Sequence, residues 1–167
     1  QASQTPCQPG TYQPSAGQTS CLDAPPGTYT NQNASVSTTP CWVGTYQPAS
    51  GETGCLVADP GHYVDQAASD SQAPCPAGTY NPSAGSISPF SCIDADPGHF
   101  APSPASVAQT PCSPGGWQNL SAQVSCNTAD PGHYVAGAAA TSQAACEPGT
   151  YQPSAGQASC LPADAGH

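Results

Sequence analysis

The apolar residues of this chain form no helical stripe, but its aromatic residues return at a nearly constant interval. Successive members of the series are 17 residues apart, except for one step of 20 residues. The series is Tyr12, Tyr29, Tyr46, Tyr63, Tyr80, Phe100, Trp117, Tyr134 and Tyr151. A glycine stands two positions before each of them. This periodicity predicts a tandem repeat with a module of 17 residues, and the frequent prolines argue against helices.

Each module is predicted to form a β-hairpin. In the first one, residues 10–13 (Gly-Thr-Tyr-Gln) are short and prone to β structure, and residues 14–17 (Pro-Ser-Ala-Gly) suit a turn before the chain returns to Cys21. The predicted fold is therefore a small disulfide-rich protein of β and irregular structure, an elongated tandem-repeat rod of hairpin modules. A β-solenoid, with one coil per module and stacked tyrosines, is the alternative.

Ten cysteines divide the modules into two alternating kinds. In bridged modules one cysteine lies three residues before the glycine and a second lies beyond the turn. In the other modules both positions lack cysteine together: alanine fills the first, and Thr38, Gln72, Gln109 or Gln143 fills the second. Two residues that are missing as a pair are expected to bond as a pair. The predicted disulfides are Cys7–Cys21, Cys41–Cys55, Cys75–Cys92, Cys112–Cys126 and Cys146–Cys160.

The double modules define five predicted repeats along the chain. Their ranges are 1–40 with a partial leading module, 41–74, 75–111 with a three-residue insertion, 112–145, and 146–167, which is truncated. Both ends of the sequence fall inside a module, so the chain is expected to be part of a longer array.

Composition narrows the class of protein. The 167 residues include 21 prolines and 17 glycines but few aromatics, so cross-links rather than a large core must stabilise the fold. Regular disulfides require an oxidising compartment, and an extracellular or cell-surface protein is expected. Lysine and arginine are absent and the formal charge is −10, which excludes nucleic-acid binding. No stretch is long and apolar enough to span a membrane.

The cysteine motifs resemble a known family. Residues 75–80 (Cys-Pro-Ala-Gly-Thr-Tyr) and residues 7–12 (Cys-Gln-Pro-Gly-Thr-Tyr), each followed by a turn and a second cysteine, are similar to ephrin-receptor-like cysteine-rich repeats. This family is related to the repeats of the tumour-necrosis-factor-receptor group. The resemblance implies tandem disulfide-rich modules of an extracellular protein.

Candidate chemistry is sparse, and no enzyme is expected. Histidines recur after the module glycine, at His62, His99, His133 and His167, where they are expected to be surface turn residues and not metal ligands. Asp59, Asp96, Asp130 and Asp164 recur before a turn, together with the nearby Asp23 and Asp94. These acids are expected to initiate turns, with weak calcium binding as the alternative. No cofactor is predicted.

Two sequons predict attached sugar. Asn33-Ala34-Ser35 and Asn119-Leu120-Ser121 fit the acceptor pattern, and the frequent serine, threonine and proline residues suit O-linked glycans. The function predicted from these features is a structural component of an extracellular stalk, appendage or filament, a glycoprotein that associates with copies of the same repeat. The alternative is an adhesin or a receptor-type ligand-binding ectodomain, with Phe90 and Trp117 in an irregular stretch from residue 87 to residue 117.

Overall fold

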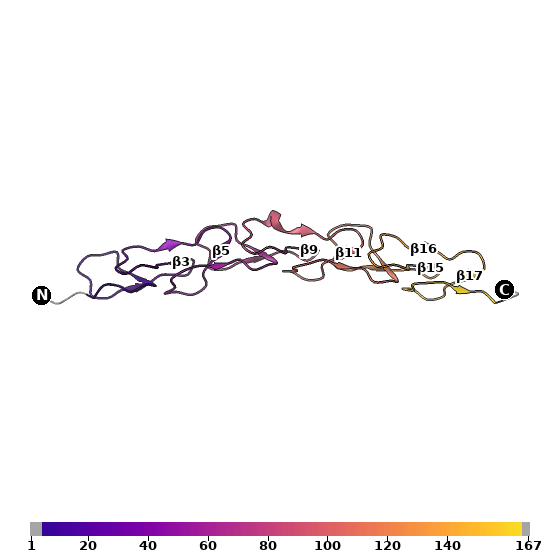
Figure 1. The fold of residues 1–167 in the computed structure, drawn as a ribbon, viewed down its shortest axis with the longest axis horizontal. Coiled ribbons are helices and arrows are strands. Elements are labelled where there is room, and N and C mark those ends of the chain that lie inside the picture. Colours follow the sequence, from indigo (N-terminus) through magenta and orange to yellow (C-terminus); the bar gives the residue numbers. More distant parts are fainter. Residues whose placement is uncertain (1–4, 165–167) are drawn as a thin grey trace. The chain divides into compact units, whose positions relative to one another are not determined.

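The computed structural model describes residues 5–164, which consist of short strands joined by long loops (Figure 1). Every strand has two residues, and the one helix among these residues is a 3-10 turn, η1 (Pro89–Ser91). The strands are β1 (Thr11–Tyr12), β2 (Leu22–Asp23), β3 (Thr28–Tyr29), β4 (Thr39–Pro40), β5 (Thr45–Tyr46), β6 (Leu56–Val57), β7 (His62–Tyr63), β8 (Ala73–Pro74), β9 (Thr79–Tyr80), β10 (Ile93–Asp94), β11 (His99–Phe100), β12 (Thr110–Pro111), β13 (Gly116–Trp117), β14 (Asn127–Thr128), β15 (His133–Tyr134), β16 (Ala144–Ala145), β17 (Thr150–Tyr151) and β18 (Leu161–Pro162).

Each strand pairs with its neighbour in sequence to form a separate antiparallel hairpin. In the first hairpin Thr11 lies opposite Asp23 and Tyr12 lies opposite Leu22, and the same register returns at Thr45 and Tyr46. Every sheet formed by the described residues has two strands, so these strands form no closed barrel. The prediction of hairpin modules is confirmed.

A tight turn begins every module and explains the glycine that precedes the first strand. The Thr11 amide and the Thr11 hydroxyl both donate to the Gln8 carbonyl, at 3.0 and 2.8 Å. Gly10 lies inside this turn with a φ of 89°, a left-handed conformation that favours glycine. The Thr-Tyr pair then leaves the turn as a strand.

Backbone hydrogen bonds also join each module to the next one. The amides of Gly10 and Gln13 donate to the carbonyls of Thr30 and Ser35 at 2.8 and 2.9 Å, and the amide of Ala34 donates back to the Cys7 carbonyl at 2.7 Å. The equivalent three bonds recur at Gly98, Ala101 and Ala122, so the docking of neighbouring modules follows one pattern.

The chain forms two compact units. Of the described residues, 5–74 and 83–91 form the first unit, which contains β1 to β8 and η1. Residues 75–82 and 92–164 form the second, which contains β9 to β18. The insertion of the third predicted repeat therefore belongs to the first unit, although the cysteines that flank it belong to the second.

The buried side chains are small. In eight successive modules the residue three positions before the module glycine is at most 7% exposed, and it is alternately cysteine and alanine. These residues are Cys7, Ala24, Cys41, Ala58, Cys75, Ala95, Cys112 and Ala129. Because such side chains bury little apolar area, hydrogen bonds and disulfides must contribute much of the stability.

A second left-handed position follows seven residues after each turn glycine. It holds glycine in four modules, at Gly17, Gly51, Gly85 and Gly156, and alanine with φ of 55–58° in the others, at Ala34, Ala68, Ala105, Ala122 and Ala139. A left-handed conformation is strained for alanine and worse for larger residues, which explains why this loop position admits only the two smallest side chains.

Candidate functional site

Five disulfides close the loops of alternate modules. They join Cys7 to Cys21, Cys41 to Cys55, Cys75 to Cys92, Cys112 to Cys126 and Cys146 to Cys160, with Cα–Cα distances of 5.6–5.8 Å. These are the pairs that the sequence pattern selects. Four bridges span 14 residues, and the bridge across the insertion spans 17. No described cysteine is free.

A pair of side chains takes the place of the disulfide in three of the unbridged modules. The Gln72 carboxamide accepts from the Asp59 amide and donates to the Asp59 carboxylate, both at 2.7 Å. The same two bonds join Asp96 to Gln109 and Asp130 to Gln143, at 2.7–2.8 Å. We call each of these pairs an Asp–Gln clamp. Sequence analysis assigned these aspartates to turns and missed their glutamine partners.

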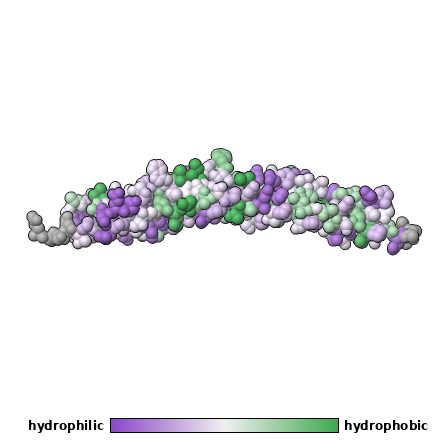
Figure 2. Space-filling view, viewed as in Figure 1, coloured by the Kyte–Doolittle hydropathy of each residue, from purple (hydrophilic) through white to green (hydrophobic). Residues whose placement is uncertain are grey.

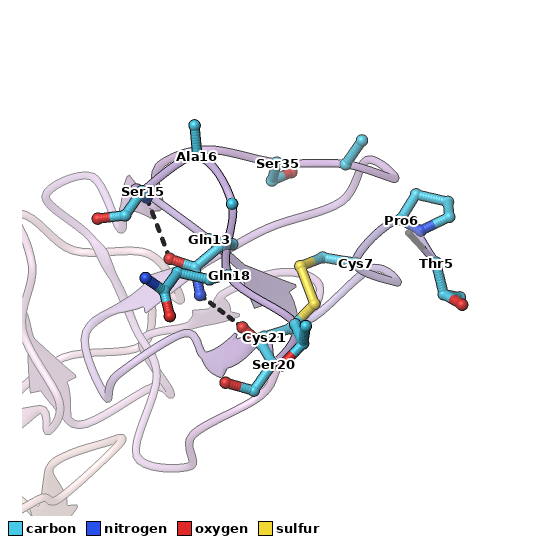
Figure 3. A pocket seen from close by; sticks show the side chains of 13 residues that line it. Thr5, Pro6, Cys7, Gln13, Ser15, Ala16, Gln18, Ser20, Cys21 and Ser35 are labelled. Carbon is cyan, nitrogen blue, oxygen red and sulfur yellow. Dashed lines mark hydrogen bonds between the residues drawn. A yellow bond between two sulfur atoms is a disulfide. The ribbon is translucent and has the colours of Figure 1, made fainter. Parts of the chain in front are cut away.

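A glutamine side chain braces the bridged loops from within (Figure 3). The Gln13 carboxamide donates to the Ser20 carbonyl and accepts from the Ser15 amide, the latter at 3.0 Å. Gln47, Gln118 and Gln152 make the equivalent two bonds in their own loops. Beside Gln13 the loop borders a groove of about 320 Å³ that Cys7, Cys21 and Ser35 also line.

Removal of one such brace should destabilise its module. Gln118 is 4% exposed, and its side chain bonds the Ser125 carbonyl at 3.0 Å and the Leu120 amide at 3.2 Å. We expect Gln118→Ala to lower the free energy of unfolding by about 1–3 kcal/mol, because two polar backbone groups lose their partner. Urea denaturation measures the change. The exposed Gln157 is the control: Gln157→Ala should change stability by less than about 0.5 kcal/mol.

The recurring histidines and acids do not gather into one site. The described histidines, His62, His99 and His133, are half-buried, and the Nδ1 atom of each lies 3.3–3.4 Å from the carbonyl oxygen of the proline two residues earlier. Among residues 5–164 no group of three or more histidine, cysteine or acidic residues is arranged to hold a metal ion. The predicted His167 lies outside the described residues.

Both sequon asparagines lie on exposed loops. Asn33 precedes the left-handed Ala34, and the Ser35 hydroxyl donates to the Gln32 carbonyl at 2.9 Å. Asn119 follows the buried Gln118 and begins the turn region of its bridged loop. Either side chain is therefore accessible for a glycan on the folded surface.

Several exposed apolar side chains stand where the sequence departs from its repeat. On the surface, hydrophobic patches stand between hydrophilic stretches (Figure 2). In the first unit Ile87 lies beside Gly44: its Cγ2 atom is 3.0 Å from the point where a Cβ added to Gly44 would be. Val57 lies beside Gly85 in the same way, with its Cγ1 atom 3.3 Å from an added Cβ. Trp42 and Phe90 flank these residues in sequence and are 73% and 95% exposed. We call Trp42, Val57, Ile87 and Phe90 the apolar cluster; Trp117 is half-buried in the second unit.

The start of the chain matches a family model. Residues 2–41 match the model described as tyrosine-protein kinase ephrin type A/B receptor-like. This part of the chain is therefore similar to an ephrin-receptor-like cysteine-rich repeat. The resemblance inferred from the sequence is confirmed, and the five disulfides in a repeated pattern are consistent with ephrin-receptor-like repeats along the rest of the chain.

Ephrin-receptor-like repeats are extracellular modules, and the disulfides point to the same compartment. The matched family is receptor-like and not an enzyme family. No curated protein that was compared with the chain matches it. In the part of the chain that the structure describes, no helix is both long and apolar enough to cross a membrane.

Proposed function

We propose that this array is a structural component of an extracellular stalk, appendage or filament. The observation that carries the proposal is the repeated docking between neighbouring modules: the bonds of Gly10, Gln13 and Ala34 return at Gly27, Thr30 and Gly51 and again at Gly115, Gln118 and Ala139. Each module offers its neighbour the same backbone groups. Identical units joined by a constant step extend without a limit set by the interface, which suits a scaffold.

The exposed sequons support a glycosylated form of this scaffold. Glycans at Asn33 and Asn119 would stand on loops and leave the buried cysteine and alanine positions untouched. Intact-mass analysis of the native protein before and after enzymatic deglycosylation tests this part. A mass loss that disappears in the Asn33→Gln and Asn119→Gln double variant is expected, and an unchanged native mass would contradict it.

Immunogold electron microscopy of the source cells tests the structural role. Antibodies raised against the folded, oxidised chain are expected to label extracellular stalks, appendages or filaments along their length. Antibodies against the reduced chain serve as the control for recognition of unfolded material. Labelling confined to the cell interior, or only of dispersed secreted molecules, would overturn the proposal.

An adhesin or receptor-type binding role is the second candidate, and the apolar cluster favours it. Val57 occupies the position that Asp23 and Asp94 hold in other bridged modules, and Ile87 and Phe90 belong to the insertion. Ile87 lies beside Gly44 and Val57 lies beside Gly85, and Phe90 projects from the same insertion with 95% of its surface exposed. Screening the chain against glycan and protein arrays tests this role: binding that Phe90→Ala abolishes and Leu120→Ala preserves would support it, and the absence of any such binder would exclude it.

A further inference from the structure

The disulfides divide the covalent chain into two kinds of segment with respect to a pulling force. Tension that enters at Cys7 crosses to Cys21 through the sulfur atoms, so the loop between them carries no load. The chain between one bridge and the next carries all of it. We call these load-bearing stretches the linkers; they are residues 21–41, 55–75, 92–112 and 126–146.

All four linkers have the same length. Each runs over 20 residue steps from the second cysteine of one bridge to the first cysteine of the next. The insertion, which breaks the aromatic interval, falls inside the loop that Cys75 and Cys92 close, where the separation is 17 and not 14. The one irregularity of the repeat is therefore shielded from load.

No disulfide closes a linker, so hydrogen bonds and small buried side chains such as Ala24 and Ala95 hold the linkers in the folded array. Linker 21–41 makes three backbone bonds to the preceding bridged loop, through Thr30, Ala34 and Ser35, and three to the following loop, through Ala24, Gly27 and Thr30. Linkers 92–112 and 126–146 have the equivalent six bonds. A bridged loop cannot lengthen without breaking a covalent bond, whereas a linker lengthens once such bonds break.

The Asp–Gln clamp distinguishes one linker from the other three. Linkers 55–75, 92–112 and 126–146 each contain a clamp that ties residues 13 apart. Linker 21–41 has Pro25 and Thr38 at the equivalent positions, which cannot form the pair of bonds. This linker should yield at the lowest force.

We propose that the array is an extension-limited tether, in which equal hydrogen-bonded linkers unravel under load while the disulfide-bridged loops stay closed, and the Asp–Gln clamps set the force at which linkers yield. The inference rests on the proposed structural role, in which a stalk or filament bears tension. Each extended linker contributes about 70 Å of contour length, from 20 residues at about 3.5 Å each. The closed loops keep 73 residues (four separations of 14 and one of 17) from extending, which corresponds to about 250 Å of contour length.

Single-molecule force spectroscopy on the whole chain, pulled through tags at its two ends, tests the tether. The oxidised chain is expected to give one weak and three stronger unfolding events with equal gains in contour length. After reduction with a phosphine the total contour length should rise by about 250 Å. A single event for all linkers, or unequal gains, would overturn the proposal.

Substitutions test the role of the clamp in the same measurement. Gln72→Ala should turn one of the three stronger events into a second weak event, and Pro25→Asp with Thr38→Gln should turn the weak event into a fourth strong one. The control is Gln123→Ala, since Gln123 lies inside a bridged loop and its side chain bonds the Ser121 carbonyl of that loop. It should leave all events unchanged. Unfolding forces that are unchanged in Gln72→Ala would show that the clamp does not set the force at which linkers yield.

These results are independent of the location of the protein. If antibodies label a stalk but all linkers unfold in a single event, the structural role stands and the tether is rejected. Correct force traces from a protein that labels no extracellular structure would reject the structural role alone.

Discussion

Replacing Gly98 with alanine should destabilise the second unit more than the same substitution at Gly132 or Gly149. A Cβ on Gly98 would lie 2.2 Å from the Ala139 carbonyl oxygen and 2.8 Å from its carbon. Ala139 lies two modules further along the chain, so the added methyl group meets the backbone of a docked module. The backbone cannot move aside as a flexible side chain does, and the φ of 84° is strained for alanine. Because overpacking and this strain add, we expect the free energy of unfolding to fall by roughly 3 kcal/mol or more.

The two control glycines separate the steric effect from the conformational one. Gly132 and Gly149 have φ of 80° and 86°, and apart from their immediate chain neighbours no atom of residues 5–164 lies within 4 Å of an added Cβ at either position. Alanine at either position should lower the free energy of unfolding by only about 1–2 kcal/mol, which is the penalty of the left-handed conformation. Urea denaturation of the three variants compares the values. Equal losses at all three positions would show that the module two steps away does not press on Gly98.

The hairpins could be predicted because local chemistry determines them. A left-handed glycine, a pair that ends in an aromatic residue, and a proline- or glycine-containing loop are sufficient to form a turn and two short strands. The pair is Thr-Tyr in five modules and His-Tyr, His-Phe or Gly-Trp in the others. The contact of Gly98 with Ala139 could not be predicted in this way. It spans 41 residues, which is two modules plus seven residues, and it depends on how successive hairpins dock.

The Asp–Gln clamps could have been predicted from the sequence. Gln72, Gln109 and Gln143 fill the empty second cysteine position, and each chain segment also places an aspartate after the first. In the module that has Thr38 there, the aspartate is replaced by Pro25. The two residues are present together and absent together, which is the argument that pairs the cysteines. The glutamine braces left a weaker signal, because Gln13 makes its bonds only to backbone.

Binding residues are harder to infer from this chain. Phe90 and Trp117 stand out in the sequence, yet they belong to different units, and Phe90 is almost fully exposed while Trp117 is half-buried. Val57 looks like an ordinary strand residue until the structure places it beside Gly85. The approach of positions 28 residues apart is a property of module docking, and periodicity alone does not reveal it.

Reduction of the disulfides is expected to unfold the array. The chain-entropy model assigns roughly 3 kcal/mol to a loop of about 15 residues, so five bridges contribute on the order of 15 kcal/mol. That sum is as large as the whole stability of a typical domain, and the buried residues here are mostly cysteine and alanine. Hydrogen exchange measured by mass spectrometry should show protected amides at Gly10, Gly27 and Gly98 in the oxidised chain and none after reduction.

Removal of one bridge tests whether its contribution is local. The Cys112→Ser and Cys126→Ser double variant should lower the free energy of unfolding by about 3 kcal/mol. Exchange should rise first at Gly98, whose amide donates to Gln118 in the opened loop, and at Gly115, whose amide donates from that loop to Val135. Peptide mapping of the oxidised wild-type chain after pepsin digestion supplies the reference, because a chain without lysine or arginine offers trypsin no cleavage site. Links such as Cys21–Cys41, or a reduced chain that keeps its protected amides, would contradict the bridged hairpin as the stabilising unit. Retained protection would instead assign the stability to the hydrogen bonds between modules, since the small buried side chains cannot supply it.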